Sequence, residues 1–165
     1  MSIKTYTIRE IQANDNEQIA KIIREVLIEF GVPKVGTAYE DTALDIMFET
    51  YNIPDAAYYV ITDDSNIIGG AGIMQLQNTT EKICELQKMY FSPIARGKGF
   101  GSKIMETCLE KARQLGFEKC YLETLPYMKN ARKLYHKVGF ESLNAPLGDT
   151  GHYSCNMWML KDLKK

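Results

Sequence analysis

The stretch 94-IARGKGFGSKIM-105 sets the organisation of this chain, because it joins a glycine-rich loop to the start of a helical pattern. Three glycines, Gly97, Gly99 and Gly101, fall within five positions, and a basic residue stands on each side of the first. An extended segment precedes the loop. A strand that enters a helix through such a turn leaves unpaired backbone amides at the positive end of the helix dipole. The pattern predicts an anion-binding loop, with a merely tight connection as the alternative.

The spacing of the glycines narrows the kind of anion site. It fits neither the dinucleotide pattern G-x-G-x-x-G nor the phosphate loop G-x-x-x-x-G-K-S/T, which disfavours a nucleotide-binding protein. It does fit R/Q-x-x-G-x-G/A, beginning at Arg96 and ending at Gly101. Glycine lets the backbone approach phosphate oxygens closely, and Arg96 and Lys98 add positive charge. We expect this loop to hold a phosphate-bearing ligand.

The rest of the chain alternates between strand and helix patterns. Apolar periodicity and turn residues predict strands at 4–10, 57–63, 67–76, 82–91, 118–124, 140–143 and 153–160, and helices at 14–31, 41–51, 99–115 and 127–139. Strand 82–91, helix 99–115 and strand 118–124 form a β-α-β unit, so the two strands should be parallel neighbours. The sequence therefore predicts an α+β domain with one mixed sheet, spanning 1–165 as a single unit.

Composition and charge limit the partners. Lys and Arg number 20 against 21 Asp and Glu, so no long-range field favours nucleic acid or an anionic membrane. No apolar run approaches the ~20 residues of a spanning helix, and the first residues lack the apolar core of a signal peptide. The four cysteines are widely spaced without a C-x-x-C pair, which indicates reduced buried thiols rather than disulfides or zinc. We expect a cytoplasmic protein without metal, nucleic acid or membrane partners.

Two segments carry a family resemblance. The stretches 89-MYFSPIARGKGFG-101 and 131-ARKLYHKVGF-140 resemble the GNAT superfamily of acetyl-CoA-dependent N-acetyltransferases, the second through its A-x-x-L-Y-x-x-x-G-F pattern. The order of elements is similar over nearly the whole chain. The resemblance implies an α+β three-layer fold, with a mixed, mostly antiparallel sheet, helices on both faces and a splayed central strand pair. It also implies direct transfer of an acetyl group from acetyl-CoA to a primary amine of a small molecule or peptide, and leaves a homodimer open.

The resemblance also implies how acetyl-CoA is held. The backbone of Met89 and Phe91 would pair with the pantetheine arm, the amides of Gly97 through Ser102 would take the pyrophosphate, and Tyr135 would protonate the departing thiolate. The cofactor-binding residues implied are Met89, Tyr90, Phe91, Arg96, Gly97, Lys98, Gly99, Phe100, Gly101, Ser102 and Tyr135. One family position departs, because the asparagine seven residues before the tyrosine is Met128 here. Its role is not transferred to Asn130.

Glu85 is the candidate general base. Period-two counting along strand 82–91 places Glu85 on one face with Gln87, Met89 and Phe91, which would aim it along the cofactor. In similar enzymes a glutamate on this strand deprotonates the amine directly or through water. A solvated or salt-bridged strand glutamate is the alternative. Glu123, at the end of the neighbouring strand, is a second candidate for the base or for binding the substrate.

Several other residues are weaker candidates. His152 lies in a turn-rich loop that should close over the acceptor, whereas its H-x-x-C spacing to Cys155 puts the two on opposite strand faces. His136 is expected at the surface. Gly69, Gly70 and Gly72 indicate a bulge or close packing. Four tyrosines are predicted to line an acceptor pocket or to pack in the core: Tyr39, Tyr51, Tyr58 and Tyr59.

A second function fits the same fold. A non-catalytic module that binds or senses acyl-CoA would keep the glycine-rich loop without needing a base or an acid. The presence of both Tyr135 and Glu85 favours the enzyme. Nothing in the sequence identifies the acceptor.

Overall fold

A seven-stranded sheet runs through the part of the chain that the computed structural model describes, residues 5–35, 38–124, 129–148 and 157–164. The strands lie in the order β1-β2-β3-β4-β5-β7-β6. Their bounds are β1 Tyr6–Glu10, β2 Ala56–Asp63, β3 Asn66–Gln75, β4 Ile83–Phe91, β5 Lys119–Thr124, β6 Glu141–Leu143 and β7 Met157–Asp162. The predicted strand 153–160 begins outside the described residues, and the observed β7 continues to Asp162.

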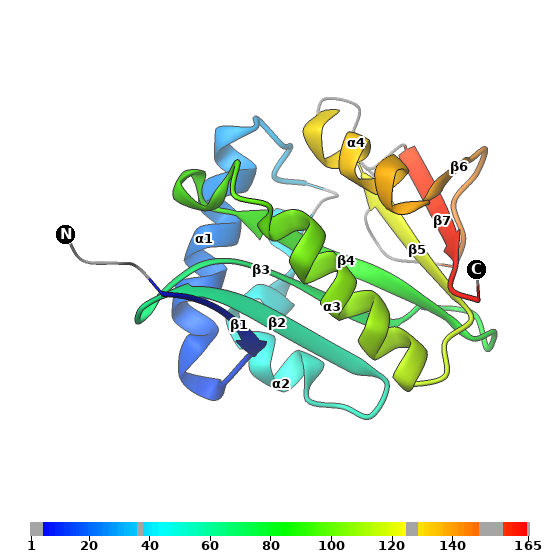
Figure 1. Ribbon diagram of the computed structural model, residues 1–165, viewed down its shortest axis with the longest axis horizontal. Helices are drawn as coiled ribbons and strands as arrows, with labels where there is room; N and C mark the ends of the chain where they lie inside the picture. Colours follow the sequence, from blue (N-terminus) through cyan, green and yellow to red (C-terminus); the bar gives the residue numbers. More distant parts are fainter. Residues whose placement is uncertain (1–4, 36–37, 125–128, 149–156, 165) are drawn as a thin grey trace.

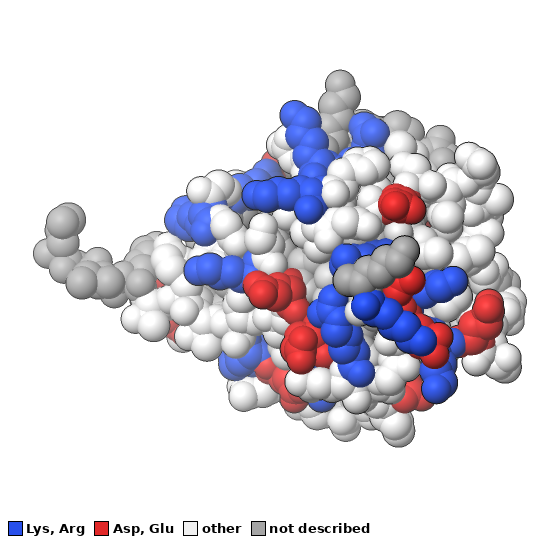
Figure 2. All heavy atoms as spheres, turned by 45° about the vertical axis from the view of Figure 1, so that its right-hand side comes forward, with Lys and Arg blue, Asp and Glu red and all other residues white. Residues whose placement is uncertain are grey.

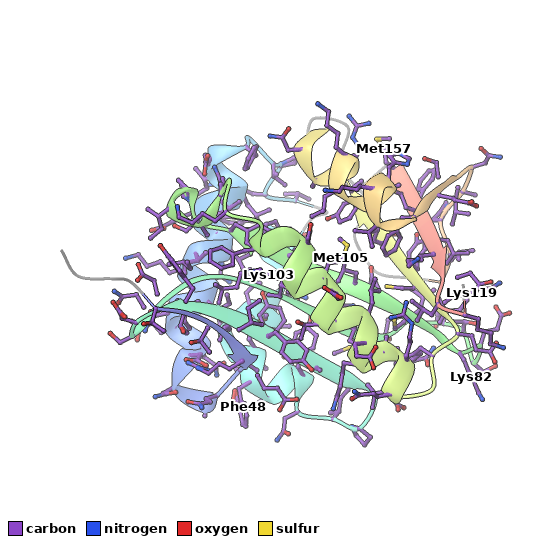
Figure 3. The ribbon with its side chains drawn as sticks, viewed as in Figure 1. Phe48, Lys82, Lys103, Met105, Lys119 and Met157 are labelled. Atoms are coloured by element: carbon purple, nitrogen blue, oxygen red, sulfur yellow. The ribbon has the colours of Figure 1, made fainter. Side chains whose placement is uncertain are left out.

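Only one pair of neighbouring strands in this described sheet is parallel. β1 to β4 form an antiparallel meander, β4 and β5 run parallel, and β7 is antiparallel to both β5 and β6. Lys82 and Lys119 mark the end where β4 and β5 start side by side (Figure 3), and the Lys119 N–H donates to the Lys82 carbonyl. The pairing stops after Glu85 and Tyr121, and the two strands then diverge (Figure 1). The predicted mixed sheet, β-α-β unit and splayed strand pair are confirmed.

Helices cover both faces of the sheet (Figure 1). α1 (Asn16–Glu29) and α2 (Met47–Tyr51) lie on one face, which we call the α1 face, and α3 (Phe100–Gln114) and α4 (Lys129–Val138) lie on the other, the α3 face. The predicted helix 41–51 is divided, because a 3-10 turn over Thr42–Ile46 precedes the short α2. Further 3-10 turns cover Ala13–Asp15, Ala38–Glu40 and Pro93–Ala95.

The core is split by the sheet into two main clusters. On the α3 face, Ile104 and the fully buried Met105 (Figure 3) pack with Ile61 of β2. On the α1 face, Ile19 and Ile23 of α1 pack with Tyr58 and Val60 of β2. Side chains alternate along a strand, so β2 supplies both clusters and is buried along its whole length. The central strands therefore hold rigid positions for residues at their ends.

The alternation breaks in β4, and this overturns one prediction. Gly70 pairs with Tyr90 and Gly72 with Gln87, so β4 contains one extra residue, a β-bulge at Lys88, whose φ is +50°. Before the bulge, Glu85 and Gln87 point to the α1 face. After it, Met89 and Phe91 pack against the cluster on the α3 face. The prediction that these four residues share one face is therefore wrong, because period-two counting does not survive an inserted residue.

The glycines of β3 explain how the bulge is held. A Cβ atom at Gly72 would lie 2.5 Å from Cδ2 of Tyr58, and one at Gly70 would lie 2.6 Å from the Tyr58 hydroxyl. The two glycines thus leave room for the Tyr58 ring, whose hydroxyl donates to the Lys88 carbonyl at 2.8 Å. This confirms the predicted close packing. The bulged carbonyl is buried but has a partner.

Candidate active site

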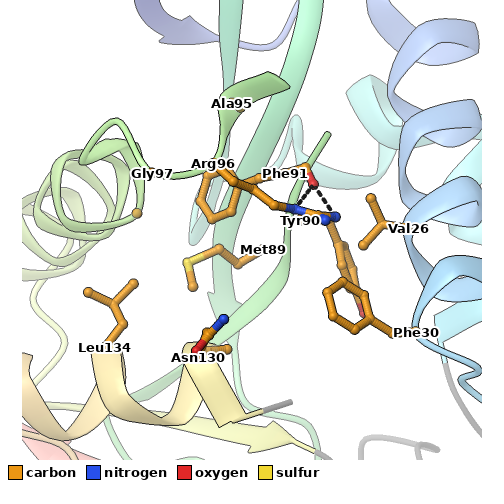
Figure 4. Close-up of a pocket in the computed structure, with 12 residues that line it drawn as sticks. Val26, Phe30, Met89, Tyr90, Phe91, Ala95, Arg96, Gly97, Asn130 and Leu134 are labelled. Carbon is orange, nitrogen blue, oxygen red and sulfur yellow. Dashed lines mark hydrogen bonds between the residues drawn. The ribbon is translucent and has the colours of Figure 1, made fainter. Parts of the chain in front are cut away.

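A cavity of about 650 Å³ opens where the glycine-rich loop meets the end of β4 (Figure 4). α1 contributes Val26, the position after α1 contributes Phe30, and α4 contributes Asn130 and Leu134. Six of the predicted cofactor residues line it: Met89, Tyr90, Phe91, Arg96, Gly97 and Gly101. The lining is mostly apolar with a few polar groups, which is typical of a binding site for an organic ligand.

The loop presents backbone amides at the start of α3. Gly97 and Gly99 adopt left-handed conformations with φ of +72° and +80°, and Gly99 is the N-cap of the helix. The Lys103 N–H donates to the Gly99 carbonyl at 3.3 Å, so the amides between them lie ahead of the first helical hydrogen bond. A Cβ atom at Gly101 would lie 2.7 Å from Leu134, so this glycine lets α4 approach the loop. The loop therefore has backbone amides ahead of the first helical hydrogen bond, as an anion site requires.

The two basic side chains of the loop are already engaged. The Arg96 guanidinium donates to both carboxylate oxygens of Glu29 at 2.6 and 2.9 Å and to the Phe91 carbonyl at 2.9 Å. The Lys98 ammonium donates to the Ile94 carbonyl at 2.7 Å. Figure 2 shows acidic and basic side chains on the same face of the molecule. Attraction for an anion at this loop therefore depends strongly on the amides and the helix dipole.

Tyr135 lies deeper than the cavity lining. It is buried in α4 on the α3 face, with its ring 6.0 Å from that of Phe140 in an edge-on arrangement. Burial raises the pKa of its hydroxyl above the ordinary range, and the nearby Cys120 thiol adds to this effect. Cys120 is the register partner of Cys84, one residue before the pairing of β4 and β5 ends. Tyr135 is thus a protonated phenol near the splayed strands. Phe100 is also buried in this cluster, so only its backbone remains available to a ligand.

Glu85 lies on the opposite side of the sheet. Its side chain is on the α1 face, the residue is 3% exposed, and one carboxylate oxygen accepts from the Gln87 amide at 2.5 Å. Burial raises the pKa of Glu85 to about 7, while the hydrogen bond from Gln87 opposes the rise. Nearby charges act in both directions, since Glu123 raises this pKa and Lys88 lowers it. The solvated strand glutamate considered from the sequence is excluded.

Four residues form a network around Glu85 that the sequence did not predict. Tyr51 of α2 donates to Gln87 at 2.6 Å, and the Lys88 ammonium lies 3.1 Å from the Asp41 carboxylate and 5.8 Å from the centre of the Tyr51 ring. Only the bulge brings Gln87 and Lys88 to the same face. The signal in the sequence was indirect, because the glycines at 69–72 indicated an irregularity but not its position in the neighbouring strand.

Glu123 lies on the same face as Glu85. It accepts a hydrogen bond from Tyr121 at 2.7 Å, and the Tyr121 oxygen in turn accepts from the Leu147 N–H at 3.1 Å. Tyr121 is the register partner of Glu85 across the parallel pair. The two carboxylates therefore stand on adjacent strands where these separate. The loop segment at Leu147 approaches this face, as expected for part of a covering loop.

The remaining candidates divide into three groups. His152, Cys155 and Met128 lie outside the described residues. His136 is exposed, as predicted. Of the tyrosines predicted to line an acceptor pocket or to pack in the core, Tyr39, Tyr51 and Tyr58 pack in or against the cluster on the α1 face, whereas Tyr59 packs in the core on the α3 face, because side chains alternate along β2.

The described residues contain no group of three or more His, Cys, Asp or Glu side chains that could hold a metal ion. None of the described helices is long and apolar enough to cross a membrane.

The described residues bring together a glycine-rich loop at the start of a helix, a cavity beside splayed strands, a buried phenol and a buried carboxylate with a raised pKa, a combination that fits an acyltransferase. The comparison with known protein families agrees with an acyltransferase. The sequence matches the acetyltransferase (GNAT) family over residues 20–140. The chain therefore belongs to the GNAT family and is an acetyl-CoA-dependent acetyltransferase.

Similar proteins support this membership. The chain is 42% identical to YjgM, an uncharacterised N-acetyltransferase of Escherichia coli (strain K12), over 94% of this chain and 93% of the relative. A GNAT-family acetyltransferase from Staphylococcus aureus Mu50 has a similar fold, with a TM-score of 0.85, 18% identity and coverage of 96% and 99% of the two chains. The PaiA N-acetyltransferase of Thermoplasma acidophilum, solved with coenzyme A, gives a TM-score of 0.73 at 18% identity, over 96% of this chain and 99% of that one.

Proposed function

We propose that this protein transfers the acetyl group of acetyl-CoA directly to a primary amine of a small molecule or peptide, in a ternary complex formed by a single domain of residues 1–165. One observation carries the proposal. Tyr135 lies on the α3 face and Glu85 on the α1 face, on either side of the place where β4 and β5 separate. A donor entering from one face and an acceptor from the other would meet between an acid and a base.

Acetyl-CoA would occupy the cavity beside the glycine-rich loop. Its pyrophosphate would accept hydrogen bonds from the amides of Gly97 through Ser102, which precede the first helical hydrogen bond of α3. The pantetheine arm would follow β4 at Met89 and Phe91, because β4 has no β5 partner beyond Glu85. Apolar walls from α1 and α4 suit the arm. The Thermoplasma protein of similar fold was solved with coenzyme A, which supports a coenzyme A site in this fold.

The residues then have distinct parts in the chemistry. Glu85 takes a proton from the bound ammonium, which frees the lone pair of the amine to attack the thioester carbonyl carbon. As the carbon–sulfur bond breaks, Tyr135 donates its proton to the departing thiolate and recovers one from the acetylated nitrogen. A carboxylate with a pKa near 7 is well matched to accept a proton near neutral pH, and a buried phenol with a raised pKa keeps its proton until the thiolate forms.

The acceptor would approach the α1 face. Glu123 stands next to Glu85 there, and we assign it to binding the ammonium form of the incoming amine, with His152 as a further candidate. We place the reaction in the cytoplasm. Among the described residues, Cys84, Cys108 and Cys120 are free and buried, which suits a reducing compartment.

Release of free coenzyme A in the presence of a panel of primary amines tests the proposal. We expect turnover with at least one amine, and we expect Glu85→Gln and Tyr135→Phe each to lower it by about 10²- to 10⁴-fold. Glu106→Gln, at an exposed position of α3, is the control and should leave the rate unchanged. Unchanged turnover in both active-site variants would refute the assignment. Binding of coenzyme A without turnover of any amine would favour the non-catalytic module.

A further inference from the structure

Five side chains form a continuous polar chain that leads to Glu85. The Asp41 carboxylate contacts the Lys88 ammonium at 3.1 Å, and the ammonium lies 5.8 Å from the centre of the Tyr51 ring. The Tyr51 hydroxyl donates to Oε1 of Gln87 at 2.6 Å, and Nε2 of Gln87 donates to Oε1 of Glu85 at 2.5 Å. The members come from the turn before α2, from α2 and from β4. These five side chains connect without any other residue that the structure describes.

All the hydrogen bonds in this chain point in the same direction. The Tyr51 hydroxyl donates its proton to Gln87, so its oxygen lone pairs remain available to the nearby Lys88 ammonium, which can only donate. Because the Gln87 oxygen is then occupied by a donor, its amide nitrogen must face Glu85. The ionised Glu85 can only accept. Each bond polarises the next, and such cooperative chains are stronger in a low-dielectric interior.

Burial makes the arrangement rigid. Tyr51 and Glu85 are each 3% exposed, and the Lys88 side chain is 5% exposed, whereas the Asp41 side chain is 29% exposed. The cation of the chain is thus shielded from water and its counter-ion reaches the surface. Burial alone would lower the pKa of Lys88, but Tyr51 and Asp41 raise it above the ordinary value, so the ammonium stays charged.

The β-bulge is what makes the chain possible. In a regular strand Gln87 and Lys88 would point to opposite faces. The left-handed backbone at Lys88 turns both side chains to the α1 face, where both meet Tyr51. A non-glycine residue in this conformation is uncommon and carries strain, which the surrounding structure must offset.

We propose that Tyr51, Gln87 and Lys88 are positioning residues that orient the Glu85 carboxylate and tune its proton affinity through this hydrogen-bond chain. The inference rests on the proposed role of Glu85 as base. The chain holds one carboxylate oxygen and leaves the other to meet the amine. It also favours the ionised form, in opposition to burial, and so keeps Glu85 able to accept a proton at neutral pH.

The groups that face Glu85 act as follows. From β4, Gln87 and Lys88 lower its pKa, while Asp41 from the turn before α2 and Glu123 from β5 raise it. Tyr51 from α2 acts through Gln87 and Lys88. Disrupting the chain should therefore move the Glu85 pKa upward.

Carbon-13 NMR of the full-length protein, labelled at the glutamate side-chain carboxyl carbons, measures this pKa without any acceptor. Glu85→Gln identifies the signal. We expect Gln87→Leu and Lys88→Met to raise the titration midpoint by at least about half a pH unit, and Tyr51→Phe to raise it in the same direction. Tyr59→Phe, a buried tyrosine on the α3 face, is the matched control and should leave the midpoint unchanged. If Lys88→Met fails to fold, Lys88→Arg is measured in its place. It keeps the cation, so its Glu85 midpoint should equal the wild-type value.

The inference would be overturned if every variant of the hydrogen-bond chain that folds had the same Glu85 midpoint as wild type. Equal shifts of the midpoint in Tyr51→Phe and Tyr59→Phe would also overturn it. The outcome is separable from that of the proposed function. If Glu85→Gln keeps full release of coenzyme A, Glu85 is not the base, and the NMR shifts would then report a structural network only. If Glu85→Gln is inactive but the Glu85 midpoint is unchanged in the Tyr51, Gln87 and Lys88 variants, then the role of Glu85 as base is supported and the positioning role of the other three residues is refuted.

Discussion

Gln87 and Lys88 are consecutive residues of β4, yet the side chains of both contact Tyr51 of α2. A strand allows this only where its alternation is broken, and here the break is the bulge at Lys88. The same irregularity separates Glu85 from Met89 and Phe91. In the proposed arrangement, the cofactor along the end of β4 and the base Glu85 on its first half would therefore face opposite sides of the sheet.

The hydroxyl of Tyr58 should be needed for the stability of this bulge. Tyr58→Phe removes the donor to the buried Lys88 carbonyl, and we expect a loss of about 1–3 kcal/mol in the free energy of unfolding. Urea denaturation measures it. Tyr59→Phe, at the next residue of β2, is the control. Equal stability of Tyr58→Phe and wild type would show that the bulge does not depend on this hydrogen bond.

Gly99 should be needed for cofactor binding through its backbone conformation. Gly99→Ala must either keep a left-handed φ, at about 1–2 kcal/mol, or reorient the loop amides, so we expect affinity for coenzyme A to fall by about tenfold. Isothermal titration calorimetry measures the affinity.

Gly116→Ala provides the matched control. Gly116 also has a left-handed φ, of +91°, but it follows the other end of α3. This variant should lose stability while keeping the affinity. A similar loss of affinity in both variants would mean that the effect arises from general destabilisation rather than from the loop.

Glu85 should make stability depend on pH in a predictable direction. Its pKa is about 7 in the folded protein against an ordinary value of 4.5, so its stabilising contribution is full below about pH 4.5 and is lost as the pH rises through 7. Glutamine does not titrate. We expect Glu85→Gln to gain stability relative to wild type between pH 5 and pH 8, by on the order of 2–3 kcal/mol.

Thermal and urea unfolding of both proteins at several pH values test this prediction. The difference between the two proteins cancels titrations that they share. A difference that stays constant from pH 5 to pH 8 would contradict a raised pKa for Glu85.

Glu29 should restrain the cationic side chain of the cofactor loop. Glu29→Gln removes the partner that holds the Arg96 guanidinium, so Arg96 becomes free to meet a phosphate. We expect tighter binding of coenzyme A and a steeper dependence on salt concentration, because exposed charges are screened by ions. Glu25→Gln, also exposed on α1, is the control. Weaker binding in Glu29→Gln would instead mean that the ion pair is needed to shape the cavity.

Local patterns were sufficient for much of the fold. The helical periodicity in 99–115 and the strand on each side of it predicted a parallel β-α-β unit, which is present, and the glycines before the helix predicted an anion loop. The two motifs also predicted the family. These features depend on residues close together in the sequence, where propensity and spacing act directly.

The prediction that failed depends on distant residues. The shared face of Glu85 and Met89 was wrong because the bulge between them is held by Tyr58 and by two glycines of another strand. The sequence predicted that Arg96 adds positive charge to the loop, but not that Glu29 of α1 is its partner.

The sequence by itself therefore determined the order of elements, the glycine-rich loop and the chemical identities of Glu85 and Tyr135. Only the tertiary structure decided that these two lie on opposite faces of the sheet, and that Tyr51, Gln87 and Lys88 lead to the carboxylate. The physical reason is that packing sets the direction in which a side chain points and the proton affinity of its titratable group. A bulge and burial are produced by contacts between strands and helices that are far apart in the chain.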